Sequence, residues 1–347
     1  MVTESADYVV GVDTHAERHA LALIEAGSGL LVLESELSAC REGYRRALRL
    51  VRRRAPGRRV WAVEGTGCYG AGLARYLAGQ GERVLEVGRP VRQGREGRFK
   101  SDPLDALRAA RSALSGQLAC PRAEGEREAL RVLLATREQA VATRRAGRNQ
   151  LRALVVTAPE GLRQRLRGLG KDQLLSSCLR LRPRAGQEPA RHATELALRS
   201  CARRVAAAHK EADELEREIS KLVRSLCPKL LAQQGVGPIS AGWLLSAWSH
   251  KGRVRSEAAF ARLAGAAPIP ASSGKTTRHR LDRGGDRKLN RALHTIVLSR
   301  RHSDPETKAY ISRRLSEGKS SREAVRCLKR YLTRSLFRLM EATAATP

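Results

Sequence analysis

Four carboxylates stand at positions where the surrounding sequence could bring them together. Asp13 ends the apolar run YVVGVD, and Glu64 ends the apolar run RVWAVE. Asp102 and Asp105 stand three residues apart in KSDPLDALRAAR, a spacing that places two residues on one face of a helix. Carboxylate oxygens are preferred ligands of Mg²⁺, and two such ions can stabilise both oxygens of a phosphoryl displacement. The pattern therefore predicts phosphoryl-transfer chemistry with Mg²⁺ as the cofactor.

Part of this pattern also has an ordinary structural interpretation. D-P-L-D is a common helix start, with Asp102 as the N-cap, Pro103 at the first helical position and Asp105 at the third. The site interpretation gains weight because two acids at strand ends coincide with two acids at a helix start. His15 and His19 fall at a turn and at the start of a strand, which does not favour a metal-binding role for them.

A candidate nucleophile lies in the C-terminal third, within PIPASSGKTTRHRLDRGGDRKLNRALHT. Its SGKTT looks like the end of a P-loop, but Ile269 stands where G-x-x-x-x-G-K-[ST] requires its first glycine, so an ATPase is not favoured. Ser272 and Ser273 instead precede a run with nine Lys or Arg residues between 275 and 301. A hydroxyl among phosphate-binding cations suits a nucleophile that attacks DNA, although a serine before glycine is also an ordinary turn residue.

The charge of the chain defines the class of partner. Its 347 residues include 66 Lys plus Arg against 35 Asp plus Glu, a formal net charge of +31 that predicts a polyanionic partner. With only 3 Trp, 6 Tyr and 3 Phe, stacking of single-stranded bases is disfavoured, and contacts to the nucleic-acid backbone should dominate. The predicted contacts are Lys275, Arg278, Arg280, Arg283, Arg287, Lys288 and Arg291.

Several classes of protein are disfavoured by what the sequence lacks. We see no apolar stretch of about 18 residues and no signal peptide, which favours a cytoplasmic, nucleoid-associated prokaryotic protein. The seven cysteines are scattered without a C-x-x-C pair, which favours reduced thiols over a zinc ribbon or a disulfide framework.

Strand and helix signals alternate through residues 1–118. The expected elements, in order, are strands over 8–13, 19–26 and 30–37, a helix over 41–54, a strand over 59–64, a helix over 69–79, a strand over 83–87, a basic glycine-rich loop, and a helix opening at Pro103. The order βββαβαβα predicts a ribonuclease H-like α/β fold, a mixed sheet that opens with a three-stranded meander. Its first and fourth strands are neighbours, so their ends should bring Asp13 and Glu64 together.

The rest of the chain is predicted to be mostly helical. Residues 119–228 are predicted to form a paired-helix arm, with a near-heptad pattern in its second stretch, ATELALRSCARRVAAAHKEADELEREISKLVRSL. A plain helical linker and a dimerising coiled coil are the alternatives that this pattern leaves open. Residues 229–347 open on a GVG turn that is either helix-hairpin-helix-like or a simple turn between helices. Their 24 Lys plus Arg and 8 Asp plus Glu give +16, whereas residues 1–118, with 19 and 14, give +5. The C-terminal unit is therefore the main expected nucleic-acid surface.

Taken together, these motifs resemble the DEDD transposases of the one-ten insertion-sequence family, which includes the Piv-type DNA invertases. GVDTH, AVEGTGCYG and KSDPLDALRAAR resemble the acidic motifs of that family. GVGPISA, FARLAGAAPIPASSGKTTRHRLDRGGDRKLNRALH and EAVRCLKRYL look like its second domain. The order and spacing of the motifs match over nearly the whole chain, while the helical middle matches only in character.

The resemblance implies a RuvC-like domain and a transposase domain that carries a serine nucleophile, acting on DNA selected by a structured bridge RNA. It further implies a dimer or larger oligomer in which subunits share sites. By position, Ser273 is the implied nucleophile, with Ser272 as its rival. The implied metal-binding tetrad is Asp13, Glu64, Asp102 and Asp105.

One segment departs from the family pattern. Many members read R-x-G-N-x-x-L-R after the serine, whereas Asp286 and Asn290 stand at two of those positions here. The individual backbone contacts of that segment therefore do not carry over.

Two other functions remain open from the sequence. One is a metal-dependent DNA junction nuclease in which water attacks, and the other is a non-enzymatic basic protein that binds nucleic acid. Catalysis is favoured over simple binding because four acids near a phosphate would repel it.

Overall fold

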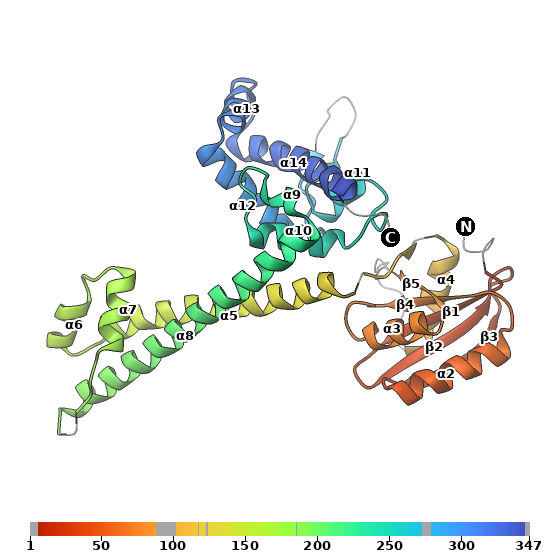
Figure 1. Ribbon diagram of the computed structural model, residues 1–347, viewed down its shortest axis with the longest axis horizontal. Coiled ribbons are helices and arrows are strands. Elements are labelled where there is room, and N and C mark those ends of the chain that lie inside the picture. The colour runs from red at the N-terminus through yellow and green to blue at the C-terminus, as the bar shows by residue number, and fades with distance from the viewer. Residues whose placement is uncertain are drawn as a thin grey trace. The chain divides into compact units, whose positions relative to one another are not determined.

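The computed structural model describes residues 6–87, 102–116, 118–122, 124–184, 186–272 and 279–343. Contacts divide the chain into two compact units, Met1–Ala123 with Gly252–Val254, and Glu124–Lys251 with Arg255–Pro347 (Figure 1). Unit 1 is a mixed α/β domain, and unit 2 is built almost entirely from helices. The predicted boundaries after residues 118 and 228 stay predictions.

Unit 1 is built on one mixed sheet with the strand order β3-β2-β1-β4-β5-β6. The strands are β1 (Tyr8–Thr14), β2 (Arg18–Glu25), β3 (Leu31–Ser38), β4 (Arg59–Glu64), β5 (Arg83–Val87) and β6 (Leu118–Ala119). The antiparallel pairs β1–β2 and β2–β3 confirm the meander, while β4 runs parallel to both β1 and β5. The carboxyl ends of β1 and β4 therefore lie side by side at one edge of the sheet.

Helices cover both faces of this sheet (Figure 1). They are α2 (Arg41–Arg54), α3 (Ala71–Gly79) and α4 (Asp102–Leu114). Because side chains alternate along a strand, Val10, Val12 and Trp61 pack with α2 and α3, whereas Val9 and Ala62 pack with α4. The predicted order βββαβαβα is confirmed, and the last helix begins at Asp102, one residue before the predicted start.

Helix α4 crosses β1 at unusually short range. A Cβ atom at Gly11 would lie 2.1 Å from the carbonyl oxygen of Ala106 and 2.4 Å from the amide nitrogen of Ala110. Ala106 also packs against Ala20, the residue that pairs with Asp13 across the sheet. Small residues on both sides thus let α4 lie directly on the sheet, with its first turn at the carboxyl end of β1.

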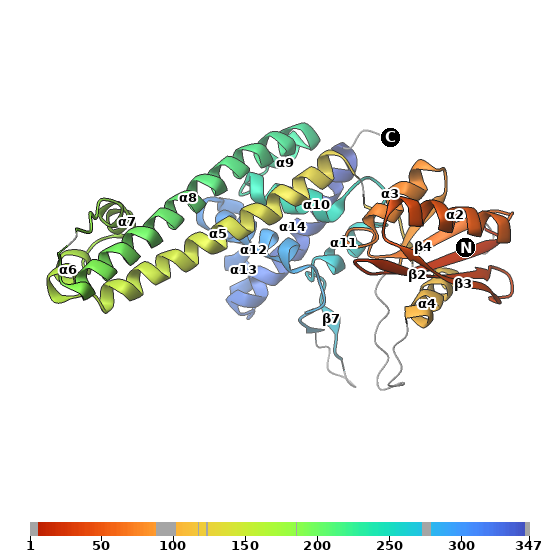
Figure 2. The same cartoon turned by 90° about the horizontal axis from the view of Figure 1, so that it is seen from below.

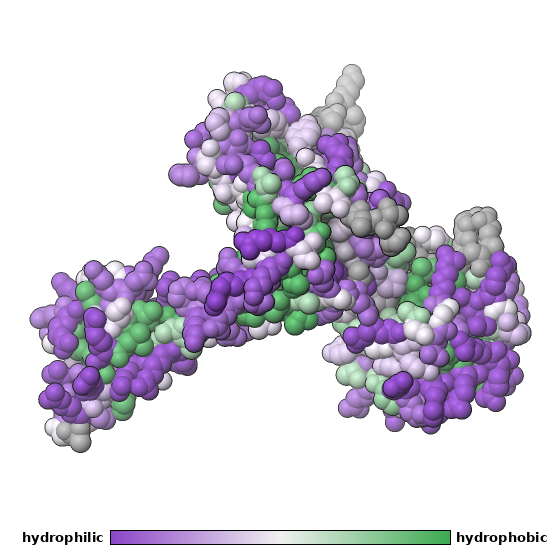
Figure 3. Space-filling view, in the orientation of Figure 1, coloured by the Kyte–Doolittle hydropathy of each residue, from purple (hydrophilic) through white to green (hydrophobic). Residues whose placement is uncertain are grey.

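Unit 2 contains two long helices that lie side by side and run in opposite directions, α5 (Glu126–Val156) and α8 (Pro189–Leu226) (Figures 1 and 2). The short helices α6 (Glu160–Leu166) and α7 (Lys171–Leu179) close one end of the pair. There they share a buried core that includes Leu151, Leu162, Leu174, Leu198 and Val205. We call the pair α5 and α8, together with α6 and α7, the arm. The two long helices of the arm pack against each other within one chain, so this packing uses apolar positions of the near-heptad pattern. Hydrophilic residues cover most of the visible face of the pair, and hydrophobic residues gather near α6 and α7 (Figure 3).

The remaining helices pack around the other end of the arm. They are α9 (Pro228–Leu231), α10 (Pro238–Trp248), α11 (Glu257–Leu263), α12 (Arg287–Ser303), α13 (Pro305–Ser316) and α14 (Ser321–Thr343), with a ribbon of β7 (Ile269–Pro270) and β8 (His279–Arg280). A Cβ atom at Gly242 of α10 would meet Leu130 and Leu134 of α5, which shows how closely the two helices pack. The GVG turn joins α9 to α10, as the sequence predicted. Within the described ranges, no helix is both long enough and apolar enough to cross a membrane.

Candidate functional site

The first two predicted acids lie at the same edge and on the same face of the sheet. Val12 and Val63 are partners in the parallel ladder, so Asp13 and Glu64 occupy the next positions of the two strands. Asp13 alternates with Val9 and Gly11, and Glu64 alternates with Val60 and Ala62, all on the face that α4 covers. The predicted convergence of these two residues is therefore present in the backbone. Asp13 is 8% exposed and Glu64 is half-buried.

The two strand ends are tied together by a side chain that the sequence analysis did not single out. Thr14 Oγ1 donates to the carbonyl oxygen of Glu64 at 2.9 Å. Directly after it, Gly65 has φ +64°, a left-handed conformation that favours glycine. The chain can therefore turn sharply after Glu64. The next residue, Thr66, is buried, and its hydroxyl has no hydrogen-bond partner among the described residues.

Two histidines hold the turn after Asp13. His15 Nε2 lies 3.1 Å from Asp13 Oδ2, and the backbone N–H of His15 donates to Nδ1 of His19 at 3.3 Å. His19 is buried and stacks on Tyr44, and burial lowers the pKa of its imidazole. Since Nδ1 accepts a hydrogen bond, the neutral ring suits this position. The pair is thus engaged in positioning the turn.

The other two predicted acids belong to the first turn of α4. Asp102 opens the helix, and its side chain lies outside the described part of the chain. Asp105 is half-buried, and its carboxylate accepts from Arg108 Nη1 at 2.8 Å, an i,i+3 pair within the helix. Because α4 lies antiparallel to β1, its first turn reaches the edge where Asp13 and Glu64 lie. The helix thus supplies two further acids to the same end of the sheet.

The side chains of Asp13, Glu64 and Asp105 fit a divalent metal in the type of donor that they offer. Carboxylate oxygens are the donors that Mg²⁺ prefers, and the unpartnered Thr66 hydroxyl adds a polar atom beside the β4 end. Among the described residues, however, no three His, Cys, Asp or Glu side chains are close enough to hold a metal ion together. Asp105 would have to turn away from Arg108 to join Asp13 and Glu64.

The predicted nucleophile region is described only in part. Ser272 is described and exposed, while Ser273, Lys275 and Arg278 lie outside the described residues. Arg280 belongs to β8, Arg283 to the following loop and Arg287 to the first turn of α12. All three are exposed, and among the described residues none has a carboxylate partner. They are available for phosphate contacts.

The last two predicted contacts are already paired. Glu138 of α5 accepts from Lys288 at 2.9 Å and from Arg291, both on α12. Although burial favours the neutral acid, these hydrogen bonds hold the pKa of Glu138 below its ordinary value. Lys288 also lies over the ring of Trp243, with Nζ 4.7 Å from the ring centroid. Lys288 and Arg291 thus help to join α12 to the arm, a role that the sequence analysis missed.

The two residues that depart from the family pattern serve the fold. Asp286 caps α12, accepting from the backbone N–H groups of Lys288 at 2.8 Å and Leu289 at 3.0 Å. Asn290 donates to the carbonyl oxygen of Ala264 at 2.6 Å. Because the Asp286 carboxylate already accepts two free N–H groups at the start of α12, this helix start is a poor site for a phosphate.

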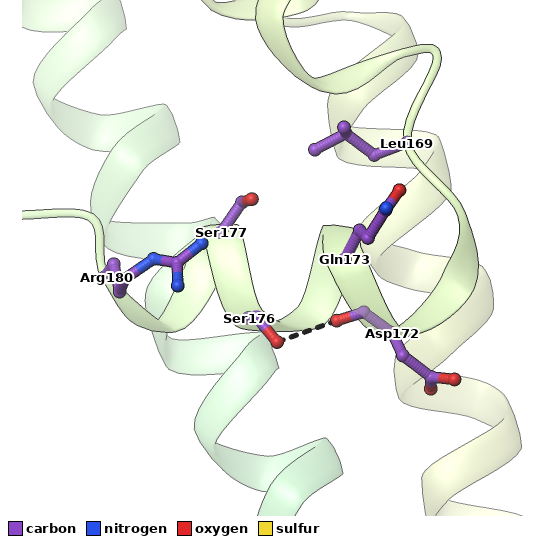
Figure 4. Close-up of a pocket in the computed structure, with 6 residues that line it drawn as sticks. All are labelled: Leu169, Asp172, Gln173, Ser176, Ser177 and Arg180. Carbon is purple, nitrogen blue, oxygen red and sulfur yellow. Dashed lines mark hydrogen bonds between the residues drawn. The ribbon is translucent and has the colours of Figure 1, made fainter.

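The arm also carries a shallow depression. It lies on α7 and is lined by Leu169, Asp172, Gln173, Ser176, Ser177 and Arg180 (Figure 4). Ser176 Oγ donates to the backbone carbonyl of Asp172 at 2.8 Å, a bond within the helix. None of the residues predicted to do chemistry lines this depression, so we assign it no role.

Comparison with known proteins adds to this geometry. The IS110 DEDD family model, described as a transposase, matches residues 10–158. A second model, described as Transposase IS116/IS110/IS902 family, matches residues 227–312. The chain is 29% identical over 202 residues to the insertion element IS110 uncharacterized 43.6 kDa protein of Streptomyces coelicolor. That match covers 57% of this chain and 48% of the relative, so the chain spans about half the length of the curated relative it matches.

Proposed function

The chain belongs to the IS110 family of transposases, and we propose that it cuts and rejoins DNA strands as the transposase of an insertion sequence. Unit 1 would be the ribonuclease H-like, RuvC-like domain, since β1 to β3 form an antiparallel meander and β4 and β5 add in parallel. The observation that carries the proposal is the placement of Asp13 and Glu64. They lie at the carboxyl ends of neighbouring parallel strands, face the same side of the sheet, and are linked through Thr14.

The acidic residues would orient the DNA phosphate for attack. Asp13, Glu64, Asp102 and Asp105 would hold Mg²⁺, which supplies positive charge that stabilises the extra charge on the phosphate in the transition state. Thr14 and Gly65 fix the ends of the two strands, so that Asp13 and Glu64 need little rearrangement. His15 holds one oxygen of Asp13, which orients that carboxylate.

Ser273 would be the nucleophile. Its hydroxyl oxygen attacks the scissile phosphorus and loses its proton, a phosphoserine ester forms, and the departing oxygen of the cut strand takes up a proton. One phosphoester replaces another, so the reverse attack by a DNA hydroxyl can rejoin strands without ATP. This agrees with the incomplete P-loop sequence at Ile269.

The covalent intermediate gives a direct test. Wild-type protein, Ser273→Ala and Ser272→Ala are incubated with labelled duplex DNA of the element end and Mg²⁺, then run on a denaturing gel. We expect a covalent adduct with the wild type and with Ser272→Ala, and none with Ser273→Ala. An adduct lost only in Ser272→Ala would move the role to that serine. Cleavage that survives in both variants without adduct would instead identify a nuclease that uses water.

Loss of a carboxylate provides the matched test of unit 1. Asp13→Asn and Glu64→Gln should lose cleavage but keep DNA binding, because each removes an acidic ligand and no positive charge. Asp105→Asn should behave in the same way if this residue leaves Arg108 to join the site. Wild-type cleavage by any of the three would remove that residue from the proposed site.

The proposal includes a guide RNA and a homo-oligomer, both implied by the family. The net charge of +31 is compatible with binding two kinds of nucleic acid. Sequencing of RNA that co-purifies with the protein tests the guide, which should map beside the element's own gene. Mixing Ser273→Ala with Asp13→Asn subunits tests the oligomer, because cleavage should return if one subunit's serine serves another subunit's acids.

A further inference from the structure

A basic cluster joins α12 to α14, outside the set of cations predicted from the sequence. Lys329 of α14 donates from Nζ to Oδ1 of Asn290 on α12, at 2.9 Å. Arg326 stands three residues before Lys329 on α14, and His294 stands four residues after Asn290 on α12. Residues at these spacings share a helix face, so the hydrogen bond between the helices gathers all four side chains in one place.

Asn290 fixes the position of the lysine ammonium. Its Nδ2 donates to the carbonyl oxygen of Ala264 at 2.6 Å, which turns Oδ1 toward Lys329. The amide is therefore held at both ends. An ammonium carries three N–H groups, and within the described residues Asn290 is the one acceptor that Lys329 Nζ contacts. The remaining donors can serve another acceptor.

The acid that stands near the cluster is engaged elsewhere: Glu323, one turn before Arg326 on α14, accepts from the backbone N–H of Ser320 at 2.8 Å and from its hydroxyl at 2.7 Å. Among the described side chains, neither Lys329 nor Arg326 forms an ion pair with a carboxylate. Burial and the nearby Arg326 lower the pKa of the Lys329 ammonium, and burial and the nearby Lys329 lower that of His294. On the same α12, by contrast, Lys288 and Arg291 share Glu138. Two cations held together without an ion-paired carboxylate raise the free energy of the folded state, which a bound anion would relieve.

A purely structural role explains only part of this arrangement. A bridge between α12 and α14 needs a donor toward Asn290, and an uncharged side chain could provide one. Such a bridge does not need Arg326 close to the partly buried ammonium of Lys329. A polyanionic ligand accounts for both features.

We infer that Lys329, Arg326 and His294 form a binding site for a phosphodiester group of nucleic acid, with Asn290 as the positioning residue. The inference rests on the proposed function. It adds a phosphate contact from α14 to the basic residues that the sequence predicted as nucleic-acid contacts before α12 and within it. A phosphodiester offers two oxygens that share one negative charge, which suits a lysine and an arginine side by side. DNA and RNA both carry this group, so the test includes both.

The salt dependence of binding tests the site. Binding of random-sequence duplex DNA and of random-sequence single-stranded RNA is measured over a range of salt for the full chain, Lys329→Gln and Arg326→Gln. Lys308→Gln, on the exposed surface of α13, is the control that loses the same charge. Each site variant should reduce the slope of log K against log[salt] by about 0.9 on duplex DNA or about 0.7 on RNA, while Lys308→Gln should not. The nucleic acid whose slope changes is the ligand.

A substitution that adds a negative charge, instead of removing a positive one, gives a second test of the site. Asn290→Asp gives Lys329 the acid it lacks and should weaken binding by about tenfold, the value of one charge-assisted hydrogen bond. Asn149→Asp makes the same charge change on the exposed surface of α5 and should leave binding unchanged. Wild-type slopes for Arg326→Gln and Lys329→Gln, with wild-type affinity for Asn290→Asp, would overturn the inference. Because Arg326 is exposed, its variant keeps the test valid even if Lys329→Gln disturbs the fold.

This experiment is separate from the test of the chemistry. It measures binding alone and can be run in the Ser273→Ala background. Failure to find a covalent adduct would overturn the nucleophile and leave the phosphate site standing. Unchanged salt slopes would overturn the phosphate site and leave the adduct result standing.

Discussion

Thr14 Oγ1 donates to the carbonyl oxygen of Glu64 at 2.9 Å, and this bond joins the ends of β1 and β4 between residues that are 50 positions apart in the chain. Thr14→Val keeps the shape of the side chain and removes the donor. We expect β1 and β4 to lose about 1 kcal/mol of local stability, because one partly buried hydrogen bond is lost. Cleavage should fall while DNA binding holds, since the two acids lose their common anchor. Hydrogen exchange of the β1 and β4 amides measures the first effect. Thr14→Ser should behave like the wild type, and full cleavage by Thr14→Val would show that the bond does not position the site.

Gly11 sets how closely α4 lies on the sheet. A methyl group there would fall 2.1 Å from the Ala106 carbonyl oxygen, so Gly11→Ala must push the helix away. Overpacking of this kind costs about 1–3 kcal/mol, and it should also displace Asp105 and reduce cleavage. Gly27→Ala is the matched control, because a Cβ there meets nothing within 4 Å. Thermal unfolding should show a lower Tm for Gly11→Ala alone. Equal Tm values would contradict the close contact.

The basic residues around the start of α12 should differ in their effect on DNA binding. Arg280, Arg283 and Arg287 are exposed without a carboxylate partner among the described residues, whereas Lys288 and Arg291 share Glu138. Substitution of each of the first three by Gln should lower the salt slope on duplex DNA by about 0.9. Lys288→Gln and Arg291→Gln should change the slope less and reduce stability instead. Equal slopes across all five variants would show that the pairing with Glu138 does not persist on DNA.

The stability of the β1–β2 hairpin should depend on pH through His19. Burial lowers the pKa of this imidazole below its ordinary 6.5, so the folded state binds fewer protons than the unfolded state in that window. Stability should hold steady above about pH 6.5 and fall as the pH drops through the lowered pKa. Hydrogen exchange of β1 and β2 amides, corrected for intrinsic rates, measures the trend. His19→Gln should flatten it, and His302→Gln, an exposed change in unit 2, should not. An unchanged slope in His19→Gln would assign the effect to other groups.

Much of unit 1 could be predicted from the sequence because its signals are local. Apolar runs such as YVVGVD and RVWAVE carry their own strand pattern and end on Asp13 and Glu64. A parallel pairing of β1 and β4 then places those two residues at one edge, as predicted. The D-P-L-D start of α4 was likewise visible in the residues themselves. The charge excess, and with it the class of partner, is a property of composition alone.

Other features were decided only when distant segments met. Whether a cation is available for DNA depends on its neighbours, and Arg291 finds Glu138, which is 153 residues away in the chain. The near-heptad arm could not reveal its partner, because an apolar stripe fits a second copy as well as another helix of the same chain. Asn290 looked like a lost phosphate contact, yet it anchors Lys329 through a bond between α12 and α14. The sequence by itself determined the local elements, the acids at their ends and the overall charge, since these need only neighbouring residues. Tertiary packing alone decided which charges are paired and which are left for a ligand, because that balance is set by contacts between residues far apart in the chain.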